Sequence, residues 1–544
     1  MEIAFADPRR AQERRLQTIL ARNESCVFGK EHGFASIRSI ADFRSRIPLS
    51  SYDQLTPWIE RMVRGERNIL TADDPVFFAV TSGSTGPRKF IPINRDLEKD
   101  LAQAQLFWLA RLIRDDSRVG ERKFLYLAPP AREGLTEGGV PYGSIAGTLF
   151  GRQERHVSRV FSAFLSRGRV IPPYVSAVKT PRLKSYLTAR LALCRSLGSI
   201  NSANPSTIVL FFRLLKDRGE ALARETRDGR LRLDIGGDLS RAEREDLAER
   251  LRPDPRAAAR LEAALEEDPL DPRKIWPGLR IVQCWLGGTL SFYVSELRRY
   301  TRELPLRDVG YRASEGFFAI PQANETAAGV LHVAGHFLEF LPDDSSSEET
   351  LLADELEAGR TYRLIVTQSG GLYRYDLEDI VQVESFYEKT PVVRFLHKAG
   401  GTLSVTGEKV TESHLLQAMH SLRAAFGLPE IEFALAVREE IPPRYVLFLE
   451  MSGIPAGGFE AGERIGRFLD EELRRRNCEY EAKRTSGRLG PPLVVRLRQG
   501  SFAGFRAKFL VLGENDPQYK PRHMISKAEE RAWLEERTIA APFD

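Results

Sequence analysis

The sequence predicts an α/β protein, with a large N-terminal domain in which helices flank β-sheets and a smaller α+β domain after it. Three observations predict this fold class. Short apolar runs alternate with helical patterns in the first part of the chain, consecutive strand-like runs follow from about residue 330, and helices and strands alternate again beyond Val410. The 544 residues are several times a typical domain, so more than one domain is expected.

The first part of the chain contains short apolar runs between turn residues, which is typical of buried strands. These predicted strands are Lys123–Ala128, Ser206–Phe212 and Arg280–Trp285. Helices are predicted at Arg95–Arg114, which has spaced apolar positions, and at Ser240–Leu265. The second helix opens with Ser240 and Glu243 at the spacing of a capping box.

An antiparallel sheet is predicted beyond residue 330. The strand Tyr362–Thr367 runs into the turn Gln368–Gly371, and the strands Leu372–Tyr375 and Asp379–Val383 follow. Such a series of strands indicates a sheet added to an α/β body.

The last part of the chain has the pattern of a separate α+β domain. Its predicted elements are the helices Glu412–Ala425 and Gly462–Arg476 and the strands Tyr445–Met451 and Leu493–Leu497. Glycine, serine and threonine cluster at Gly400–Lys409, which we interpret as a hinge. We therefore expect an N-terminal domain at 1–405 and a mobile C-terminal domain at 406–544.

Composition excludes several classes of protein. The 80 basic and 75 acidic residues leave a net charge of only +5, and no basic run is interleaved with aromatic residues, so a nucleic-acid partner is not expected. Four scattered cysteines without a CxxC pair argue against a disulfide framework or a structural zinc site. Neither a secretory signal nor a membrane span is recognisable, so we expect a cytoplasmic, soluble protein.

The strongest local signal is Pro75–Pro92, an apolar strand that runs into a loop of small and hydroxyl-bearing residues. Its loop residues that could bind an anion are Ser82, Gly83, Ser84, Thr85 and Lys89. Backbone N–H groups of such a loop can point into one concavity, and hydroxyls and a lysine add donors for phosphate oxygens. The spacing is not that of a Walker A loop, and an ordinary polar turn is the alternative.

Three other stretches hold single residues suited to a nucleotide site. Glu315 lies among small, aromatic and apolar residues, where a carboxylate binds a metal or forms a structural ion pair. Asp379 stands where a strand restarts and has the acceptors for a ribose diol. Lys520 lies between Pro517 and Pro521, which stiffen the backbone around a possible phosphate contact. By contrast, His332 and His336 lack the glutamate of a zinc helix, so we do not expect a metal there.

Taken in order, these stretches resemble the Gretchen Hagen (auxin-responsive promoter) family of acyl acid amido synthetases. That family belongs to the adenylate-forming superfamily, together with firefly luciferase and the acyl-CoA synthetases, and the resemblance implies that fold. It runs over nearly the whole chain and includes three further segments, Asp42–Pro48, Tyr52–Gly65 and Phe337–Pro342, and it ends at Gln518–Arg522.

The resemblance implies a role for each matching residue. The phosphate loop would be Ser82, Gly83, Ser84, Thr85 and Lys89, and the adenine pocket would be formed by Gly288, Thr289, Tyr311, Ala313 and Ser314. Glu315 would hold Mg²⁺, Asp379 would bind the ribose, and Lys398, Lys409 and Lys520 would act near the phosphate of AMP.

Three positions depart from the family pattern. Ala313 replaces a serine of the glutamate motif, Glu378 replaces the glycine before the ribose aspartate, and Lys398 stands where the family usually has arginine. The Glu378 charge would have to point away from the nucleotide, and Lys398 lacks the bidentate fork of arginine. These departures bear on efficiency more than on identity.

The resemblance implies a two-step ligase that uses ATP and Mg²⁺. A small carboxylic acid is adenylated to acyl-AMP with release of pyrophosphate, and the acyl group then passes to an amine, such as an amino acid, with release of AMP. Two alternatives stay open: a thiol acceptor such as CoA or a carrier protein, and a non-catalytic nucleotide- or acyl-binding protein. The sequence does not identify the acid, the amine or the oligomeric state.

Overall fold

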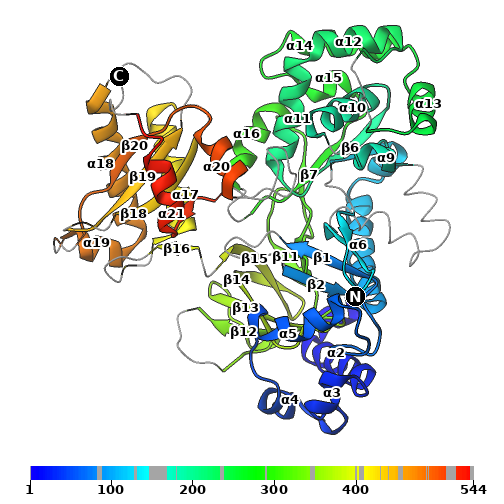
Figure 1. Ribbon diagram of the computed structural model, residues 1–544, viewed down its shortest axis with the longest axis vertical. Helices are drawn as coiled ribbons and strands as arrows, with labels where there is room; N and C mark the ends of the chain where they lie inside the picture. Colours follow the sequence, from blue (N-terminus) through cyan, green and yellow to red (C-terminus); the bar gives the residue numbers. More distant parts are fainter. Residues whose placement is uncertain are drawn as a thin grey trace. The chain divides into compact units, whose positions relative to one another are not determined.

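The computed structural model describes residues 2–81, 89–127, 132–145, 168–178, 180–232, 238–287, 291–343, 349–398, 401–403, 408, 410–428, 431–438, 440, 442–450, 458–485, 487, 489–509 and 522–539. The chain divides into two compact units, Met1–Phe395 and Leu396–Asp544. Both units combine helices and sheets (Figure 1), which confirms the predicted α/β fold class. The domain boundary expected between residues 405 and 406 stays a prediction.

Short helices begin the first unit. They are α1 (Glu2–Ala6), α2 (Pro8–Asn23), α3 (Val27–Glu31), α4 (Ile40–Arg46) and α5 (Tyr52–Val63). Gln12 connects α2 to a distant part of the chain. Its side-chain amide donates to the His336 carbonyl at 2.8 Å and accepts from the Leu338 N–H at 2.7 Å. A capping box of Ser51 and Gln54 starts α5, so the position of Tyr52 at its first turn is set by sequence.

A small sheet with the order β2-β1-β5-β4 follows. Its strands are β1 (Phe77–Thr81), β2 (Lys89–Ile93), β4 (Gly134–Leu135) and β5 (Pro141–Gly143). The predicted helix at Arg95–Arg114 is confirmed as α6 (Arg95–Asp115), which Asn94 caps through its side chain.

A parallel sheet with the order β3-β6-β7-β8 forms the α/β part of the unit. Its strands are β3 (Lys123–Tyr126), β6 (Leu197–Asn201), β7 (Ile281–Cys284) and β8 (Leu306–Asp308). The strands β3 and β7 confirm two of the three predicted buried strands. The other helices of this region are α9 (Pro173–Ser176), α10 (Pro181–Leu193), α12 (Gly219–Asp228), α15 (Pro272–Ile275) and α16 (Ser291–Thr301).

The strand predicted at Ser206–Phe212 is wrong, because this segment is helical. It lies in α11 (Pro205–Asp217), which starts with Asn204 as the cap and Pro205 at the first position. One face of the helix, with Ile208, Phe212 and Leu215, is fully buried, whereas Leu210 is 48% exposed. A short apolar run does not distinguish a buried strand from a helix, and here the start signal of a helix decides.

The single helix predicted at Ser240–Leu265 is also wrong, although its capping box is present. The chain forms two helices, α13 (Arg241–Arg250) and α14 (Pro255–Leu265), with a break at Leu251–Asp254. Pro253 and Pro255 explain the break, because a proline inside a helix removes a backbone hydrogen bond and clashes with the preceding turn.

A seven-stranded sheet with the order β12-β13-β14-β15-β11-β10-β9 confirms the predicted addition of strands. Its strands are β9 (Tyr311–Ala313), β10 (Gly316–Ile320), β11 (Gly329–Leu331), β12 (Phe337–Pro342), β13 (Thr361–Thr367), β14 (Tyr375–Tyr387) and β15 (Thr390–Lys398). The predicted strand Leu372–Tyr375 is wrong except for its last residue, because Arg374 has a φ of 44° and β14 begins after it.

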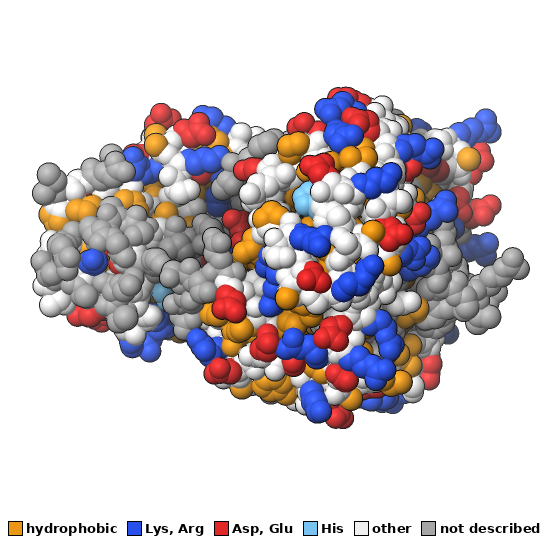
Figure 2. Space-filling model, turned by 90° about the horizontal axis from the view of Figure 1, so that it is seen from below, with side chains coloured by type: hydrophobic (Ala, Val, Ile, Leu, Met, Phe, Trp, Pro, Cys, Tyr) orange, Lys and Arg blue, Asp and Glu red, His pale blue; other side chains and the backbone are white. Residues whose placement is uncertain are grey.

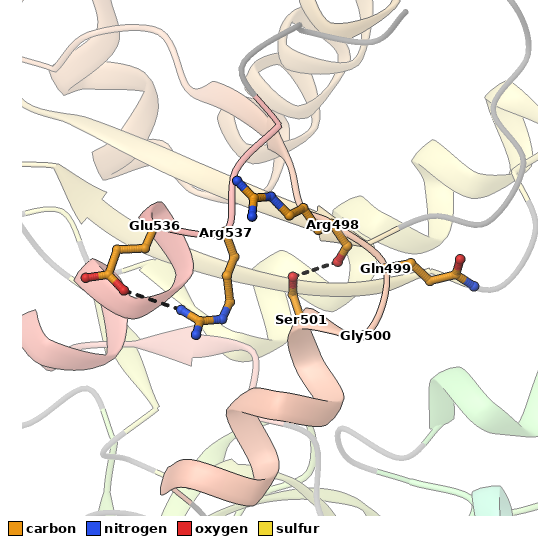
Figure 3. Close-up of a pocket in the computed structure, with 6 residues that line it drawn as sticks. All are labelled: Arg498, Gln499, Gly500, Ser501, Glu536 and Arg537. Atoms are coloured by element: carbon orange, nitrogen blue, oxygen red, sulfur yellow. Dashed lines mark hydrogen bonds and ion pairs between the residues drawn. The ribbon is translucent and has the colours of Figure 1, made fainter.

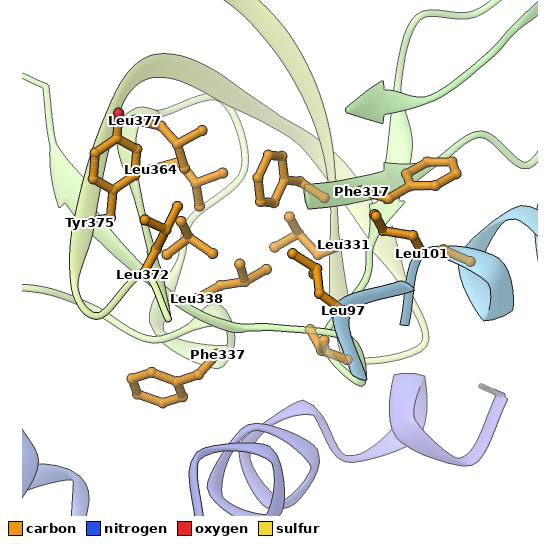
Figure 4. Packing of buried hydrophobic residues seen from close by; sticks show 14 of the residues in the cluster. Leu97, Leu101, Phe317, Leu331, Phe337, Leu338, Leu364, Leu372, Tyr375 and Leu377 are labelled. Carbon is orange, nitrogen blue, oxygen red and sulfur yellow. The ribbon is translucent and has the colours of Figure 1, made fainter. Parts of the chain in front are cut away.

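The core of this sheet is shared with α6. Leu97 and Leu101 of the helix face Phe317 and Leu331 of the sheet (Figure 4), and all four side chains are buried. Burial of large apolar side chains is the main stabilising contribution at such a contact. The hairpin that contains Tyr311 and Glu315 therefore rests on a rigid support.

The second unit has the predicted α+β pattern. Its main sheet has the order β20-β19-β18-β21, formed by β18 (Glu432–Arg438), β19 (Arg444–Glu450), β20 (Leu493–Arg496) and β21 (Met524–Ile525). Its helices are α17 (Glu412–Phe426), α18 (Gly458–Arg476), α19 (Cys478–Thr485), α20 (Ser501–Phe509) and α21 (Ala528–Glu535). A short pair, β16 (Thr402–Leu403) and β17 (Val410–Thr411), precedes them.

Basic and acidic side chains are interspersed on the face of the molecule that Figure 2 shows. That mixture agrees with the small net charge of +5. No helix among the described residues is long and apolar enough to cross a membrane.

Candidate functional site

The hairpin β1–β2 positions the predicted phosphate loop. Thr81 at the end of β1 pairs with Lys89 at the start of β2, so the two ends of the loop are held side by side. The loop itself, with Ser82, Gly83, Ser84 and Thr85, lies outside the described residues. It connects two antiparallel strands, β1 and β2.

Lys89 is half-buried and lies over an aromatic ring. Its Nζ is 5.2 Å from the centre of the Tyr52 ring, a cation–π arrangement. The Tyr52 hydroxyl in turn accepts a hydrogen bond of 2.7 Å from the Phe90 N–H. Burial, with a contribution from the nearby Glu315 charge, raises the pKa of Tyr52 to about 12. Tyr52 is therefore a neutral side chain beneath the lysine of β2.

Glu315 lies at a tight turn of the seven-stranded sheet. Ala313 pairs with Gly316, so Ser314 and Glu315 form the two-residue connection between β9 and β10. Glu315 is only 8% exposed although it stands at the tip of a hairpin. A Cβ on Gly316 would come within 2.7 Å of Phe318 and 2.8 Å of His336, so only glycine fits after the glutamate. The backbone at Glu315 is therefore tightly constrained.

Asp379 is aimed by an irregularity in β14. Arg363 pairs with Ile380 and Ile365 pairs with Asp376, so three residues of β14 face the single residue Leu364 of β13. Bulges of this kind turn side chains out of the regular alternation and are common beside active sites. Glu378, inside the bulge, has a φ of 58°, and its N–H donates to Asp376 at 2.8 Å. A left-handed backbone suits the glycine that the resemblance implies at this position, and the Glu378 side chain is exposed.

Tyr311 and Asp379 meet directly. The Tyr311 hydroxyl donates to Asp379 Oδ2 at 2.7 Å, and the two side chains are 8% and 4% exposed. The Tyr311 ring stacks on Phe395, with ring centres 5.5 Å apart and planes at 22°. Burial and the neighbouring Asp379 charge raise the pKa of Tyr311 well above that of a free phenol, so its hydroxyl keeps its proton. The structure thus brings Tyr311, one of the residues predicted for the adenine pocket, together with Asp379, the residue predicted for the ribose.

Asp308 connects two predicted parts of the adenine pocket. Its carboxylate accepts hydrogen bonds from the Leu286 N–H at 2.7 Å and from the Gly310 N–H at 2.6 Å. Leu286 leads to the Gly288–Thr289 segment, and Gly310 leads to Tyr311. Burial raises the pKa of Asp308 to about 7.

His332 and His336 contact the backbone of β10, the strand that follows Glu315. His332 Nδ1 is 3.1 Å from the Phe317 carbonyl oxygen, and the Phe317 N–H donates to His336 Nε2 at 3.3 Å. Burial lowers the pKa of His332 to about 4, and burial with the neighbouring His332 lowers the pKa of His336 well below its usual range, so both rings are neutral near pH 7. They are hydrogen-bonding partners of β10.

The structure therefore brings together five predicted residues in the first unit: Tyr311, Ala313, Ser314, Glu315 and Asp379. Lys89 lies over the ring of Tyr52, whose pKa the Glu315 charge helps to raise. Gly288, Thr289, Lys409 and Lys520 lie outside the described residues, and Lys398 is the last residue of β15, with no described side chain. Their predicted roles stay predictions.

Sequence reasoning missed three residues of this site. These are Tyr52, Asp308 and Tyr375: the Glu315 charge contributes to the raised pKa of both tyrosines, and Asp308 accepts hydrogen bonds from the Leu286 and Gly310 N–H groups. Tyr52 opens a segment already matched to the related family, which was the one available signal. Asp308 and Tyr375 act through packing and backbone contacts that a single sequence does not reveal.

A concave feature lies in the second unit, at the start of α20 (Figure 3). It is a cavity of about 330 Å³ lined by Arg498, Gln499, Gly500, Ser501, Glu536 and Arg537. The Glu450 carboxylate already accepts a hydrogen bond of 2.7 Å from the Phe502 N–H, so that helix start has a partner within the protein. None of the described predicted residues lines this cavity, so we place the candidate site in the first unit.

The arrangement has the chemistry of a site for a nucleotide phosphate and its metal. A lysine, a buried glutamate and a buried aspartate supply one cation and two groups of oxygen donors, which suit phosphate, a hard cation and a hydroxyl-bearing ligand. The aromatic pair of Tyr311 and Phe395 offers ring surface beside them.

Comparisons with known proteins agree with this picture along the whole chain. The chain matches the GH3 family N-terminal domain over residues 1–306, the GH3 family central domain over 329–398 and the GH3 family C-terminal domain over 413–529. It is 26% identical to the jasmonoyl-L-amino acid synthetase GH3.5 of Oryza sativa subsp. japonica, covering 96% of this chain and 94% of that protein. It is 25% identical to the indole-3-acetic acid-amido synthetase GH3.8 of Oryza sativa subsp. indica, covering 98% and 91%.

A solved structure of the GH3.15 acyl acid amido synthetase has the same fold. It superposes with a TM-score of 0.85 at 20% sequence identity and covers 100% of this chain and 96% of that one. These matches confirm the resemblance that the ordered motifs suggested.

Proposed function

Because the chain belongs to the GH3 family, we propose that it is an acyl acid amido synthetase, a ligase that joins a carboxylic acid to an amine at the expense of ATP. One observation supports this proposal above all others. Three separate segments of the first unit contribute to it: β2 with Lys89, the β9–β10 hairpin with Tyr311 and Glu315, and β14 with Asp379. Tyr311 donates to Asp379, Lys89 lies over the ring of Tyr52, and the Glu315 charge contributes to the raised pKa of Tyr52.

In the first step, an oxygen of the acid carboxylate attacks the α-phosphorus of ATP, and the bond to pyrophosphate breaks. In our proposal, Lys89 and the loop at 82–88 neutralise and hold the phosphates, and Asp379 accepts hydrogen bonds from the ribose hydroxyls. Orientation and neutralisation of phosphoryl charge are the main contributions of a protein to such a transfer.

In the second step, the amine nitrogen attacks the acyl carbon, the bond from that carbon to the AMP oxygen breaks, and the amine loses a proton. AMP is a good leaving group, so no covalent enzyme intermediate is needed. We assign Lys398, Lys409 and Lys520 to the phosphate of AMP, and we propose that the chain beyond residue 405 moves between the two steps.

The residues present fit a magnesium ion bound together with ATP. Mg²⁺ is typically held by one or two carboxylates together with phosphate oxygens and water, and Glu315 is a buried carboxylate. Bound there, Mg²⁺ would neutralise phosphate charge. Glu315 itself would contribute one oxygen ligand on a constrained hairpin.

Experiment has to identify the acid and the amine that the chain uses. The related plant enzymes are named for jasmonoyl and indole-3-acetic acid substrates, so a panel of aromatic and cyclic aliphatic acids is the right starting point. We propose an amino acid as the amine, again because those relatives are amino acid or amido synthetases.

The test is product identification by mass spectrometry. The chain is incubated with Mg·ATP, the acid panel and either a mixture of amino acids, CoA or no acceptor. We expect an N-acyl amino acid and AMP in equal amounts. An acyl-CoA product would favour a thiol acceptor instead. ATP binding without any AMP would indicate a non-catalytic binding protein.

A further inference from the structure

Tyr311 and Asp379 make an unusual long-range contact within one sheet. The strands β15, β11 and β10 lie between β14 and β9 in the sheet order. Four strand spacings correspond to about 19 Å in a flat sheet. Because the Tyr311 hydroxyl is 2.7 Å from Asp379 Oδ2, the sheet must curl so that its strands face each other across the interior. The contact is therefore a tertiary bond across the sheet.

The tyrosine is itself held in place. Its ring stacks on Phe395 and lies 5.1 Å from the ring of Phe318, so its hydroxyl has little freedom to move. An aspartate has two rotatable side-chain bonds, and a hydrogen bond from a fixed donor removes much of that freedom. Hydrogen bonds to a carboxylate are about twice as strong as neutral ones. The bond thus fixes the orientation of the Asp379 carboxylate before any ligand arrives.

We propose that Tyr311 is a positioning residue that gives Asp379 its selectivity for the ribose hydroxyls of the nucleotide. This inference rests on the proposed function, since it assumes that Asp379 binds ribose. A fixed carboxylate recognises a hydroxyl by direction as well as by charge, and an analogue without that hydroxyl leaves the buried acceptor poorly satisfied. Without the bond from Tyr311, the carboxylate can rotate toward another donor. It then discriminates less between nucleotides with and without the ribose hydroxyl.

The test compares equilibrium binding of Mg·ATP and Mg·2′-deoxyATP by titration calorimetry, without an acid substrate. The wild-type chain is expected to bind ATP about tenfold more tightly, the size of one charged hydrogen bond. Tyr311→Phe removes only the hydroxyl and is expected to reduce this ratio to about threefold or less. Tyr373→Phe is the matched control, because Tyr373 is also fully buried and donates to the Leu70 carbonyl at 2.7 Å, and it should keep the wild-type ratio.

A second comparison separates positioning from a general loss of stability. In an Asp379→Asn background, Tyr311→Phe should not change the ratio further, since the tyrosine acts through the aspartate. If Tyr311→Phe does not fold, Phe395→Leu loosens the ring instead and should lower the ratio partially.

The outcomes distinguish this inference from the proposed function. A folded Tyr311→Phe or Phe395→Leu chain with the wild-type ratio would overturn the positioning role, as would a wild-type chain that binds both nucleotides equally yet catalyses adenylation. A wild-type chain that binds neither nucleotide would overturn the proposed function itself.

Discussion

Two buried carboxylates of the seven-stranded sheet differ in the groups that bind them. Glu339 of β12 accepts hydrogen bonds from Arg374 at 3.0 and 3.2 Å, from Arg44 at 3.0 Å and from the Thr350 hydroxyl at 2.6 Å. Asp379 of β14 accepts a hydrogen bond of 2.7 Å from the phenol of Tyr311. Two guanidinium groups neutralise Glu339, whereas the phenol that donates to Asp379 is uncharged and orients the carboxylate.

The difference teaches that burial alone does not identify a carboxylate that binds ligand. Glu339 is 1% exposed and Asp379 is 4% exposed, so the two are equally hidden from water. Glu339 holds the Arg374 side chain, and Arg374 also donates to the Ile47 carbonyl at 2.9 Å, so this network connects three segments of the first unit. We therefore expect changes at Glu339 to affect folding and changes at Asp379 to affect nucleotide binding.

Replacing Glu339 by glutamine is expected to have the largest effect. It leaves the buried Arg374 charge without its carboxylate, and removal of one partner of a buried ion pair costs about 3–5 kcal/mol. The midpoint of urea unfolding should fall accordingly. Glu66→Gln is the control, because Glu66 pairs with Arg61 at 2.8 Å in an exposed position and should change little. An unchanged midpoint for Glu339→Gln would show that the network does not stabilise the fold.

Replacing Asp379 by asparagine is expected to weaken ATP binding about ten- to hundredfold, the value of a charged hydrogen bond, with little change in the melting temperature. Calorimetry and thermal unfolding measure the two quantities separately. Asp376→Asn is the matched control on the same strand, since Asp376 pairs with Arg363 at 3.3 Å and should leave ATP affinity unchanged. Equal affinities for wild-type and Asp379→Asn chains would remove the ribose assignment.

Asp308 offers a third, pH-dependent comparison. Burial raises its pKa from 3.8 to about 7. A carboxyl group with a raised pKa binds its proton more tightly in the folded chain, so its contribution to stability is present at low pH and is lost as the pH rises toward 7. Relative to Asp308→Asn, the wild-type free energy of unfolding should fall by about 1–3 kcal/mol between pH 5 and pH 7.

Urea unfolding of both chains at pH 5, 6 and 7 measures this difference. Any other titrating group contributes equally to both chains, so the comparison isolates Asp308. A difference that stays constant with pH would mean that Asp308 keeps an ordinary pKa.

Glu378 is expected to show the smallest effect. Its φ of 58° is a backbone conformation that glycine adopts without penalty, so Glu378→Gly should stabilise the chain by up to about 1 kcal/mol. Glu388→Gly is the control, because Glu388 has a φ of 55° in the next turn and should give a similar gain. Loss of stability in Glu378→Gly alone would show that the glutamate side chain supports the bulge.

The sequence predicted most of the architecture, because many elements carried their own local signals. The strands β3, β7, β13, β19 and β20 and the helices α6, α17 and α18 match predicted segments. The errors have physical causes. The run Ser206–Phe212 is too short for its periodicity to distinguish a strand from a helix. Arg374 has a φ of 44°, which an arginine in the sequence does not predict.

Residues of the candidate site that lie in a sequence motif could be predicted. Residues that reach the site only through packing of distant segments could not. Glu315 and Asp379 were identified from their motifs, and the structure brings Asp379 to Tyr311 across the curled sheet. Tyr52 and Asp308 were not predicted, because their places depend on contacts between distant segments. The phosphate loop and Lys520 lie outside the described residues, so their roles rest on the family resemblance.

The most direct measurement of the proposed function is exchange of labelled pyrophosphate into ATP in the presence of the acid panel. The account predicts exchange that requires both Mg²⁺ and a carboxylic acid, and that falls strongly in Asp379→Ala. Exchange that is as fast in Asp379→Ala as in the wild-type chain, or a chain that binds ATP but exchanges pyrophosphate with no acid of the panel, would contradict it.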